Sequence, residues 1–134
     1  MTKGITELTR IAQLSVSPEE KVHLAFKEHF SSYLSRFPDY GVLLHEKTNL
    51  LPSKKENEIR QEFKMYFSLW KQIIVEGIDK GAFRQDMNPS ATVYAALGMS
   101  NWVYKWFSPE GELTLNEINA LFDSIFLKGV LPRK

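Results

Sequence analysis

The sequence contains no cysteine, which excludes disulfide bonds and thiol chemistry and is typical of a reducing, cytosolic setting. It also lacks an excess of charge, since seventeen Lys and Arg against sixteen Asp and Glu give a net charge of +1. Nucleic-acid-binding domains usually carry a basic excess or a basic stripe, so we do not expect this segment to bind DNA directly. It has no apolar run long enough to cross a bilayer and no signal peptide core. We therefore expect a cytoplasmic protein without a membrane partner.

Catalytic and metal-binding motifs are also missing. His23 and His29 lie six residues apart on one expected helix, an offset that does not place them on one face, and there is no HExxH pattern. Residues 98–102 (GMSNW) begin like a nucleophile elbow, but tryptophan stands where the final glycine belongs, and the segment lies within an expected helix. Paired acids and bases and phosphate loops are absent as well. We expect no catalytic residue, metal or cofactor, and the chain is not predicted to be an enzyme.

The signals that are present are those of helices. Ser17-Pro18, Ser53, Asn88-Pro89 and Thr114 each start a segment in which apolar residues recur at helical spacing. No segment shows the alternation of a half-buried strand. Helices are therefore expected over about residues 4–14, 17–37, 39–48, 53–80, 89–107 and 114–128. The 134 residues are predicted to form one all-α domain (1–134) of five or six helices.

Aromatic residues concentrate on two of these helices and could face one another. Such a stripe forms a hydrophobic core more often than a ligand pocket, and a histidine among phenylalanines is more often hydrogen-bonded than catalytic. However, the polar groups of Tyr33, Tyr66 and Trp70, and Asn101 within an apolar helix, are what an apolar small-molecule site requires. The candidate ligand-binding residues are Phe26, His29, Phe30, Tyr33, Phe63, Tyr66, Phe67, Trp70, Asn101 and Trp102.

The segment 89–107 is apolar on nearly every side, and a helix without a polar face must be covered all round. A chain this short has few elements for that covering, and the last helix also carries more than one apolar stripe. A self-complementary patch of this kind predicts a homodimer. The candidate interface residues are Val103, Trp106, Ile118, Phe122, Ile125 and Phe126.

Residues 76–130 resemble the ligand-binding domain of TetR-family bacterial transcriptional regulators, and most closely the branch that senses fatty-acyl or steroid-derived coenzyme A thioesters. The matching pieces are G-x-F-R at 81–84, the Asn88-Pro89 helix start, and L-G-x-x-N-W-x-x-x-W-F at 97–107. A P-x-G turn, an acidic capping box and a terminal F-L-x-G at 126–129 complete the pattern. The preceding helices fit the family in length and order but carry no sharp motif.

The resemblance implies that the last two helices of each subunit pack against their twofold mates as a four-helix bundle. Family members begin with a three-helix DNA-binding unit, which this chain does not show, so DNA binding is expected only through a missing domain. An expression fragment and a truncated gene both remain open. The predicted function is ligand sensing and dimerisation in a TetR-like transcriptional repressor, with an apolar effector, acyl-coenzyme A among the candidates. The alternative is a stand-alone helical interaction module that forms heterodimers with a full-length relative.

Overall fold

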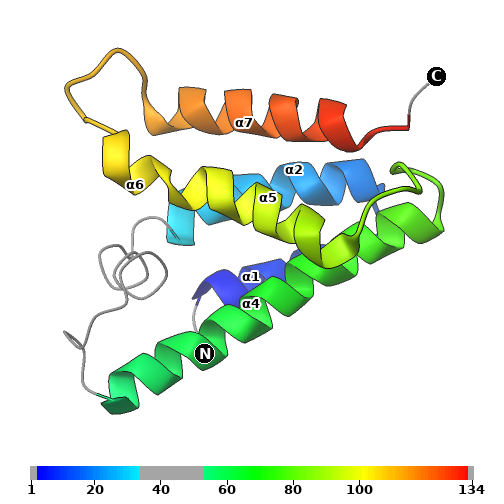
Figure 1. Cartoon of the computed structure of the whole chain (residues 1–134), viewed down its shortest axis with the longest axis horizontal. Coiled ribbons are helices and arrows are strands. Elements are labelled where there is room, and N and C mark those ends of the chain that lie inside the picture. Colours follow the sequence, from blue (N-terminus) through cyan, green and yellow to red (C-terminus); the bar gives the residue numbers. More distant parts are fainter. Residues whose placement is uncertain (1–2, 34–52, 133–134) are drawn as a thin grey trace.

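The computed structural model describes residues 3–33 and 53–132, and they form helices connected by short turns (Figure 1). The elements are α1 (Lys3–Ala12), α2 (Pro18–Glu28), the π-helical turn η1 (His29–Tyr33), α4 (Ser53–Asp79), α5 (Pro89–Asn101), α6 (Val103–Trp106) and α7 (Leu115–Val130). No strand occurs in these two ranges, so the all-α prediction is confirmed. Within the same ranges, none of the helices combines the length and the apolar character that crossing a bilayer requires.

Three predicted helix starts are formed by side-chain caps. The Ser17 hydroxyl accepts a hydrogen bond from the backbone in the first turn of α2, and Asn88 does the same at α5. At α7 the capping box is complete, because Thr114 Oγ1 accepts from the Glu117 N–H at 3.1 Å while Glu117 Oε1 accepts from the Thr114 N–H at 2.9 Å. These local bonds satisfy backbone donors that a helix leaves unpaired, which explains why the boundaries could be predicted.

The end of α4 is fixed by two glycines. Gly81 has a φ of +75°, the left-handed conformation that glycine adopts without steric cost. The N–H groups of Ala82 and Phe83 both donate to the Gly77 carbonyl, at 2.9 and 3.0 Å, which closes the helix. The fully buried Phe83 ring then lies directly on Gly77. The turn therefore requires a glycine at each position for a different reason.

We expect Gly77→Ala to lower the free energy of unfolding by about 1–3 kcal/mol, the usual cost of overpacking a core. A Cβ at this position would overlap the Phe83 ring, which is held by the turn. Denaturant unfolding followed by circular dichroism measures the effect. Gly129→Ala in α7 is the matched control, because its Cβ would meet nothing within 4 Å and alanine favours a helix. Equal stability of the two variants would contradict the packing described for Phe83.

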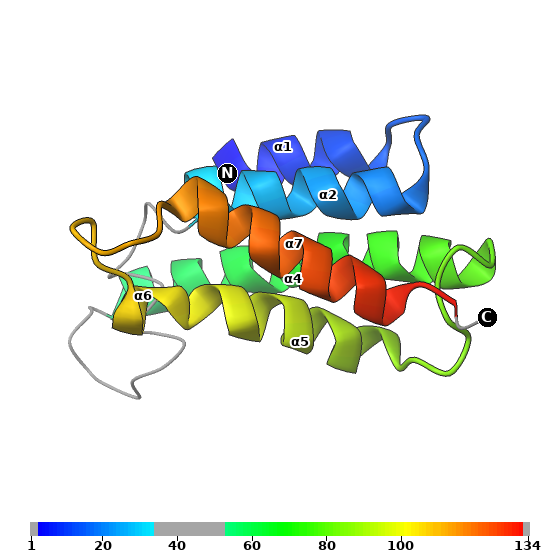
Figure 2. The same ribbon diagram turned by 90° about the horizontal axis from the view of Figure 1, so that it is seen from above.

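The helices form three layers around one core. In Figure 1, α1 and α4 lie on one side, α2 and α5 in the middle, and α7 across the opposite side. The long α4 contacts α1, α2 and α5, and α7 contacts α2 and α5. Figure 2 shows α7 running between α2 and α5 when the molecule is seen from above. Consequently α7 has one face on the core and one face outward.

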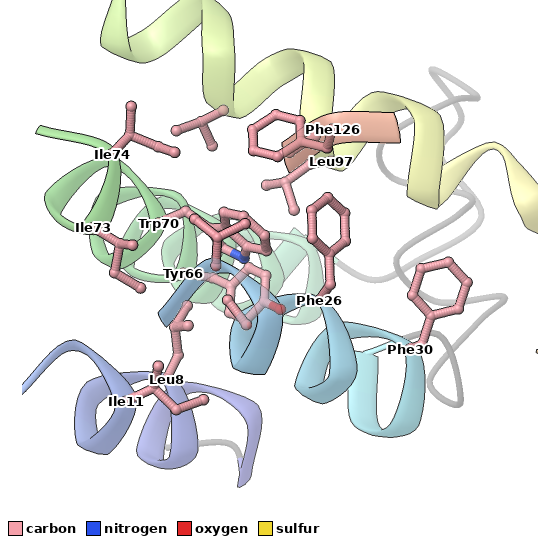
Figure 3. Close-up of a cluster of buried hydrophobic side chains, with 14 of the residues drawn as sticks. Leu8, Ile11, Phe26, Phe30, Tyr66, Trp70, Ile73, Ile74, Leu97 and Phe126 are labelled. Atoms are coloured by element: carbon pink, nitrogen blue, oxygen red, sulfur yellow. The ribbon is translucent and has the colours of Figure 1, made fainter. Parts of the chain in front are cut away.

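The core is rich in large side chains from every layer (Figure 3). Leu8 of α1 and Ile73 of α4 fill one end. In the centre, the Phe26 ring meets Trp70 at 5.1 Å and Phe126 at 5.3 Å, in both cases edge to face. All five residues are buried, so much of the predicted aromatic stripe is hydrophobic core.

Two helices are interrupted where the sequence predicted continuity. α2 ends at Glu28 and passes into the π-helical turn η1, and the expected α5 breaks after Asn101 before resuming as α6. Neither point carries a proline or a glycine, so no local signal marks it. The predicted helix over residues 39–48 and the expected end of the second helix at Phe37 lie outside the described residues.

Candidate functional site

A buried histidine connects the two places where a helix is interrupted, the junction of α2 with η1 and the end of α5. His29, the first residue of η1, is fully buried. Its Nδ1 lies 2.9 Å from the Tyr66 hydroxyl of α4, and its Nε2 lies 2.8 Å from Oδ1 of Asn101, the last residue of α5. We call His29, Tyr66 and Asn101 the histidine cluster. It joins three elements that are far apart in the sequence.

The histidine cluster carries no charge. Burial lowers the pKa of His29 to about 3, although the hydrogen bond with Asn101 acts in the opposite direction, so the ring is neutral near pH 7. A neutral imidazole has one N–H. Because Oδ1 of Asn101 can only accept, Nε2–H donates to it, and Nδ1 accepts from the Tyr66 hydroxyl. The cluster is therefore an uncharged polar group within an apolar interior, and it provides no cation for an anionic ligand.

Half-buried aromatic rings lie beside the histidine cluster on α4. Phe63 and Phe67 occupy the turn that contains Tyr66, and their ring centroids are 6.2 Å apart. The Phe67 ring lies 4.7 Å from that of Tyr94 on α5, which is 63% exposed. A series of rings therefore leads from the surface to the buried polar groups, the combination expected of an apolar ligand site.

The predicted ligand-binding residues separate into three groups. The structure brings Phe26, His29, Phe30, Tyr66, Trp70 and Asn101 together in the buried interior, with Phe63 and Phe67 at its edge. The side chain of Tyr33 lies outside the described residues. The structure places Trp102 apart from this group, because its side chain is 50% exposed and its ring lies 5.9 Å from the Lys105 ammonium. It follows Asn101 directly, so the helix turns it away from the interior.

The predicted interface residues divide into some that are buried within the subunit and some that are exposed. Val103, Ile118 and Phe126 are buried within the subunit itself, so they do not lie on its surface as we expected. Trp106 and Ile125 are 48% and 54% exposed. Phe122 is half-buried, and its ring lies 6.5 Å from that of Trp106.

Leu121 of α7 is also exposed and was not predicted as part of this surface. Leu121 lies one turn before Ile125, and this spacing was the signal that could have identified it. We call the exposed apolar residues Trp106, Leu121 and Ile125 the outer apolar face.

An ion pair and a histidine–carboxylate contact between helices were not predicted either. Lys21 of α2 is buried, and its Nζ donates to the Ala12 carbonyl and to Glu76 Oε1, both at 2.7 Å. On the other side of α2, His23 Nδ1 lies 2.5 Å from Oδ2 of Asp123 in α7. In sequence, a lysine on the inward side of a helix looks like any surface lysine. No group of three or more acidic, histidine or cysteine side chains that could hold a metal occurs in the described part of the chain.

Comparisons with known proteins identify relatives over most of the chain. Residues 15–130 match the family model described as the tetracyclin repressor-like C-terminal domain. The HTH-type transcriptional repressor KstR2 of Mycobacterium tuberculosis is 23% identical over 121 residues, which cover 90% of this chain and 60% of the relative. KstR2 of Mycolicibacterium smegmatis is 25% identical over 122 residues, covering 90% of this chain and 59% of the relative. The chain thus spans about 60% of the length of these curated relatives.

Solved structures have the same fold. A transcriptional regulator of the TetR/AcrR family from Thermobifida fusca is 26% identical, with a TM-score of 0.79 over 95% of this chain and 66% of that chain. AibR, solved in complex with isovaleryl coenzyme A and operator DNA, is 20% identical, with a TM-score of 0.68 over 98% of this chain and 70% of that chain. The second likeness, at its lower identity, concerns the fold alone.

Proposed function

The chain belongs to the TetR family of transcriptional regulators, as a tetracyclin repressor-like C-terminal domain, and from this premise we propose that it senses an apolar small molecule among α2, α4 and α5. The observation that supports this is the histidine cluster, an uncharged group of hydrogen-bonding side chains among aromatic rings. Ligand pockets are mostly apolar, with a few polar groups that fix the orientation of the ligand. In a complete regulator, binding here would control a separate DNA-binding part.

For the effector we propose an acyl-coenzyme A. The rings of Phe63 and Phe67 suit an acyl chain, and the exposed Lys64 and Lys71 on the same helix could meet the phosphates of the coenzyme outside the pocket. The likeness of the fold to AibR, whose structure holds isovaleryl coenzyme A, supports the same class. The comparisons give no support to the alternative of a stand-alone interaction module.

The regulatory step requires that the effector bind one conformation of the domain more tightly than another. Two irregular elements bear on the histidine cluster, because His29 begins η1 and Asn101 precedes the break between α5 and α6. A ligand that moves His29 or Asn101 changes how α5 joins α6. Because the outer apolar face includes residues of α6 and α7, such a change would alter how two subunits pack.

We expect decanoyl-coenzyme A to raise the melting temperature of the protein by several degrees. A ligand present at one hundred times its dissociation constant stabilises the folded state by about 2.7 kcal/mol. Differential scanning fluorimetry with acyl chains of increasing length measures the shift, and coenzyme A without an acyl group is the control. Mass spectrometry of the native protein reports any ligand retained during purification. No shift with any acyl chain would overturn the acyl-coenzyme A assignment.

We further propose that the protein forms a homodimer through the outer apolar face. Monomeric proteins rarely expose large contiguous apolar patches, and such a patch marks an interaction surface. Trp106 contacts Phe122 beneath it, so α6 and α7 present their exposed side chains together.

A further inference from the structure

The indole N–H of Trp70 is a buried donor without an acceptor. The Trp70 ring lies in the middle of the core and has no solvent exposure (Figure 3). Its Nε1 has no hydrogen-bond partner among the residues that the structure describes. An unsatisfied buried donor costs about 1–3 kcal/mol, and buried tryptophans normally find a partner. A native structure that keeps such a group needs a reason for it.

The described neighbours of Trp70 do not explain why its N–H is left unsatisfied. Its described ring contact is with Phe26, edge to face at 5.1 Å, and an aromatic ring is at best a weak acceptor. Tyr66 lies one turn earlier on α4, but its hydroxyl is hydrogen-bonded to His29. The donor is therefore placed beside the histidine cluster, on the same side of α4, and is left available.

The surroundings also restrict the charge of whatever this donor binds. The ring of His29 is neutral, as argued above, and offers no positive charge. Lys21, the buried lysine of α2, is already paired with Glu76 and the Ala12 carbonyl. A carboxylate brought to Trp70 would lose its hydration without gaining a cation, which is costly. An uncharged acceptor would not incur this desolvation cost.

We propose that the Trp70 N–H donates a hydrogen bond to the uncharged carbonyl oxygen of the effector, so that the site selects acyl thioesters, esters or ketones over free carboxylic acids. This inference rests on the proposed ligand-sensing function. In an acyl-coenzyme A that atom is the thioester oxygen, at the junction between the apolar chain and the coenzyme.

The position of Trp70 also implies how the ligand arrives. Phe67 lies one turn before it on α4, is half-buried, and packs against the exposed Tyr94. Because Trp70 itself is inaccessible, a ligand can reach the N–H only if neighbouring rings such as Phe67 change rotamer. The rearrangement would provide the two conformations that ligand-controlled regulation needs.

The test compares decanoyl-coenzyme A with the thioether S-decyl-coenzyme A, which lacks only the carbonyl oxygen. Titrations followed by calorimetry give both affinities, and nitrogen-15 correlation spectra report the three indole N–H groups. Single substitutions of Trp70, Trp102 and Trp106 by phenylalanine assign the three resonances. We expect the thioester to bind about tenfold more tightly than the thioether, the value of one well-formed hydrogen bond. Only the thioester should move the Trp70 proton downfield.

The Trp70→Phe variant should bind the two compounds equally, because it keeps an aromatic ring but has no donor. Equal binding of both compounds to the parent protein, with the Trp70 resonance unmoved, would overturn this inference and leave the proposed function standing. Tighter binding of decanoate than of the thioester would overturn it in the same way. If neither coenzyme A compound binds, the proposed effector class fails and this inference fails with it. Even if Trp70→Phe does not fold, the comparison of the thioester with the thioether on the parent protein tests the proposed hydrogen bond.

Discussion

Ile125→Glu should convert the protein from a dimer to a monomer in solution. Ile125 is 54% exposed on α7, one turn after Leu121, which is 51% exposed. If these side chains meet a second subunit about a twofold axis, each substitution places two unpaired carboxylates in the interface. A buried unpaired charge costs several kcal/mol, so we expect the dissociation constant to rise at least about a thousandfold.

Light scattering coupled to size-exclusion chromatography at micromolar concentration measures the oligomeric state. The matched control is Met65→Glu, which places the same charge on another exposed apolar residue, 44% accessible and located on α4. We expect this variant to remain a dimer. A dimeric Ile125→Glu protein would show that the outer apolar face is not the interface, and a monomeric parent would remove the dimer proposal altogether.

The parts of the fold that the sequence predicted well are those that local chemistry determines. The caps at Ser17, Asn88 and Thr114 form hydrogen bonds within four residues, so a single sequence contains the whole signal. The turn at Gly81 is local in the same sense, because its left-handed conformation requires no distant partner. In the candidate site, the aromatic residues and His29 were recognised as a group because helical spacing places them on facing sides.

The parts that could not be predicted depend on contacts between distant elements. Both Ile118 and Ile125 lie on α7, which is apolar on two sides, and periodicity alone cannot show which side faces the core. The exposure of Trp102 follows from Asn101 facing inward, where it meets His29 from a helix seventy-two positions earlier. The unsatisfied N–H of Trp70 is likewise invisible in sequence, since it is defined by partners that are absent.

The second large effect concerns Glu76, whose removal should lower the free energy of unfolding by about 3 kcal/mol. In Glu76→Ala, the buried Lys21 keeps the Ala12 carbonyl but loses its counter-charge. Breaking a buried ion pair by removing one partner is strongly destabilising, at about 3–5 kcal/mol, and the partial exposure of Glu76 places the estimate at the low end. Because Lys21 holds the end of α1 against α2 and α4, the variant should also loosen α1.

Lys80→Ala is the matched control, since Lys80 pairs with the same carboxylate at 3.2 Å but is largely exposed. Exposed ion pairs contribute about 0–1 kcal/mol, so this variant should unfold close to the parent. The double variant Lys21→Met with Glu76→Leu removes both charges and should recover much of the lost stability. If Glu76→Ala lowered the free energy of unfolding no more than Lys80→Ala does, the ion pair between Glu76 and Lys21 would not contribute to stability.

The destabilisation by Glu76→Ala should also depend on pH, and its direction follows from the pKa of the carboxyl group. Burial alone would raise this pKa, but the hydrogen bonds and charges of Lys21 and Lys80 outweigh burial and hold it below the ordinary value. A group whose pKa is depressed by folding contributes stability above its unfolded pKa, about 4.3 for glutamate, and loses that contribution as the pH falls through the folded value. The difference between parent and variant should therefore be full at pH 7 and shrink below about pH 4. Urea unfolding of parent and variant at pH 7 and below about pH 4 measures this difference. A difference that does not change with pH would mean that Glu76 acts through packing and not through its charge.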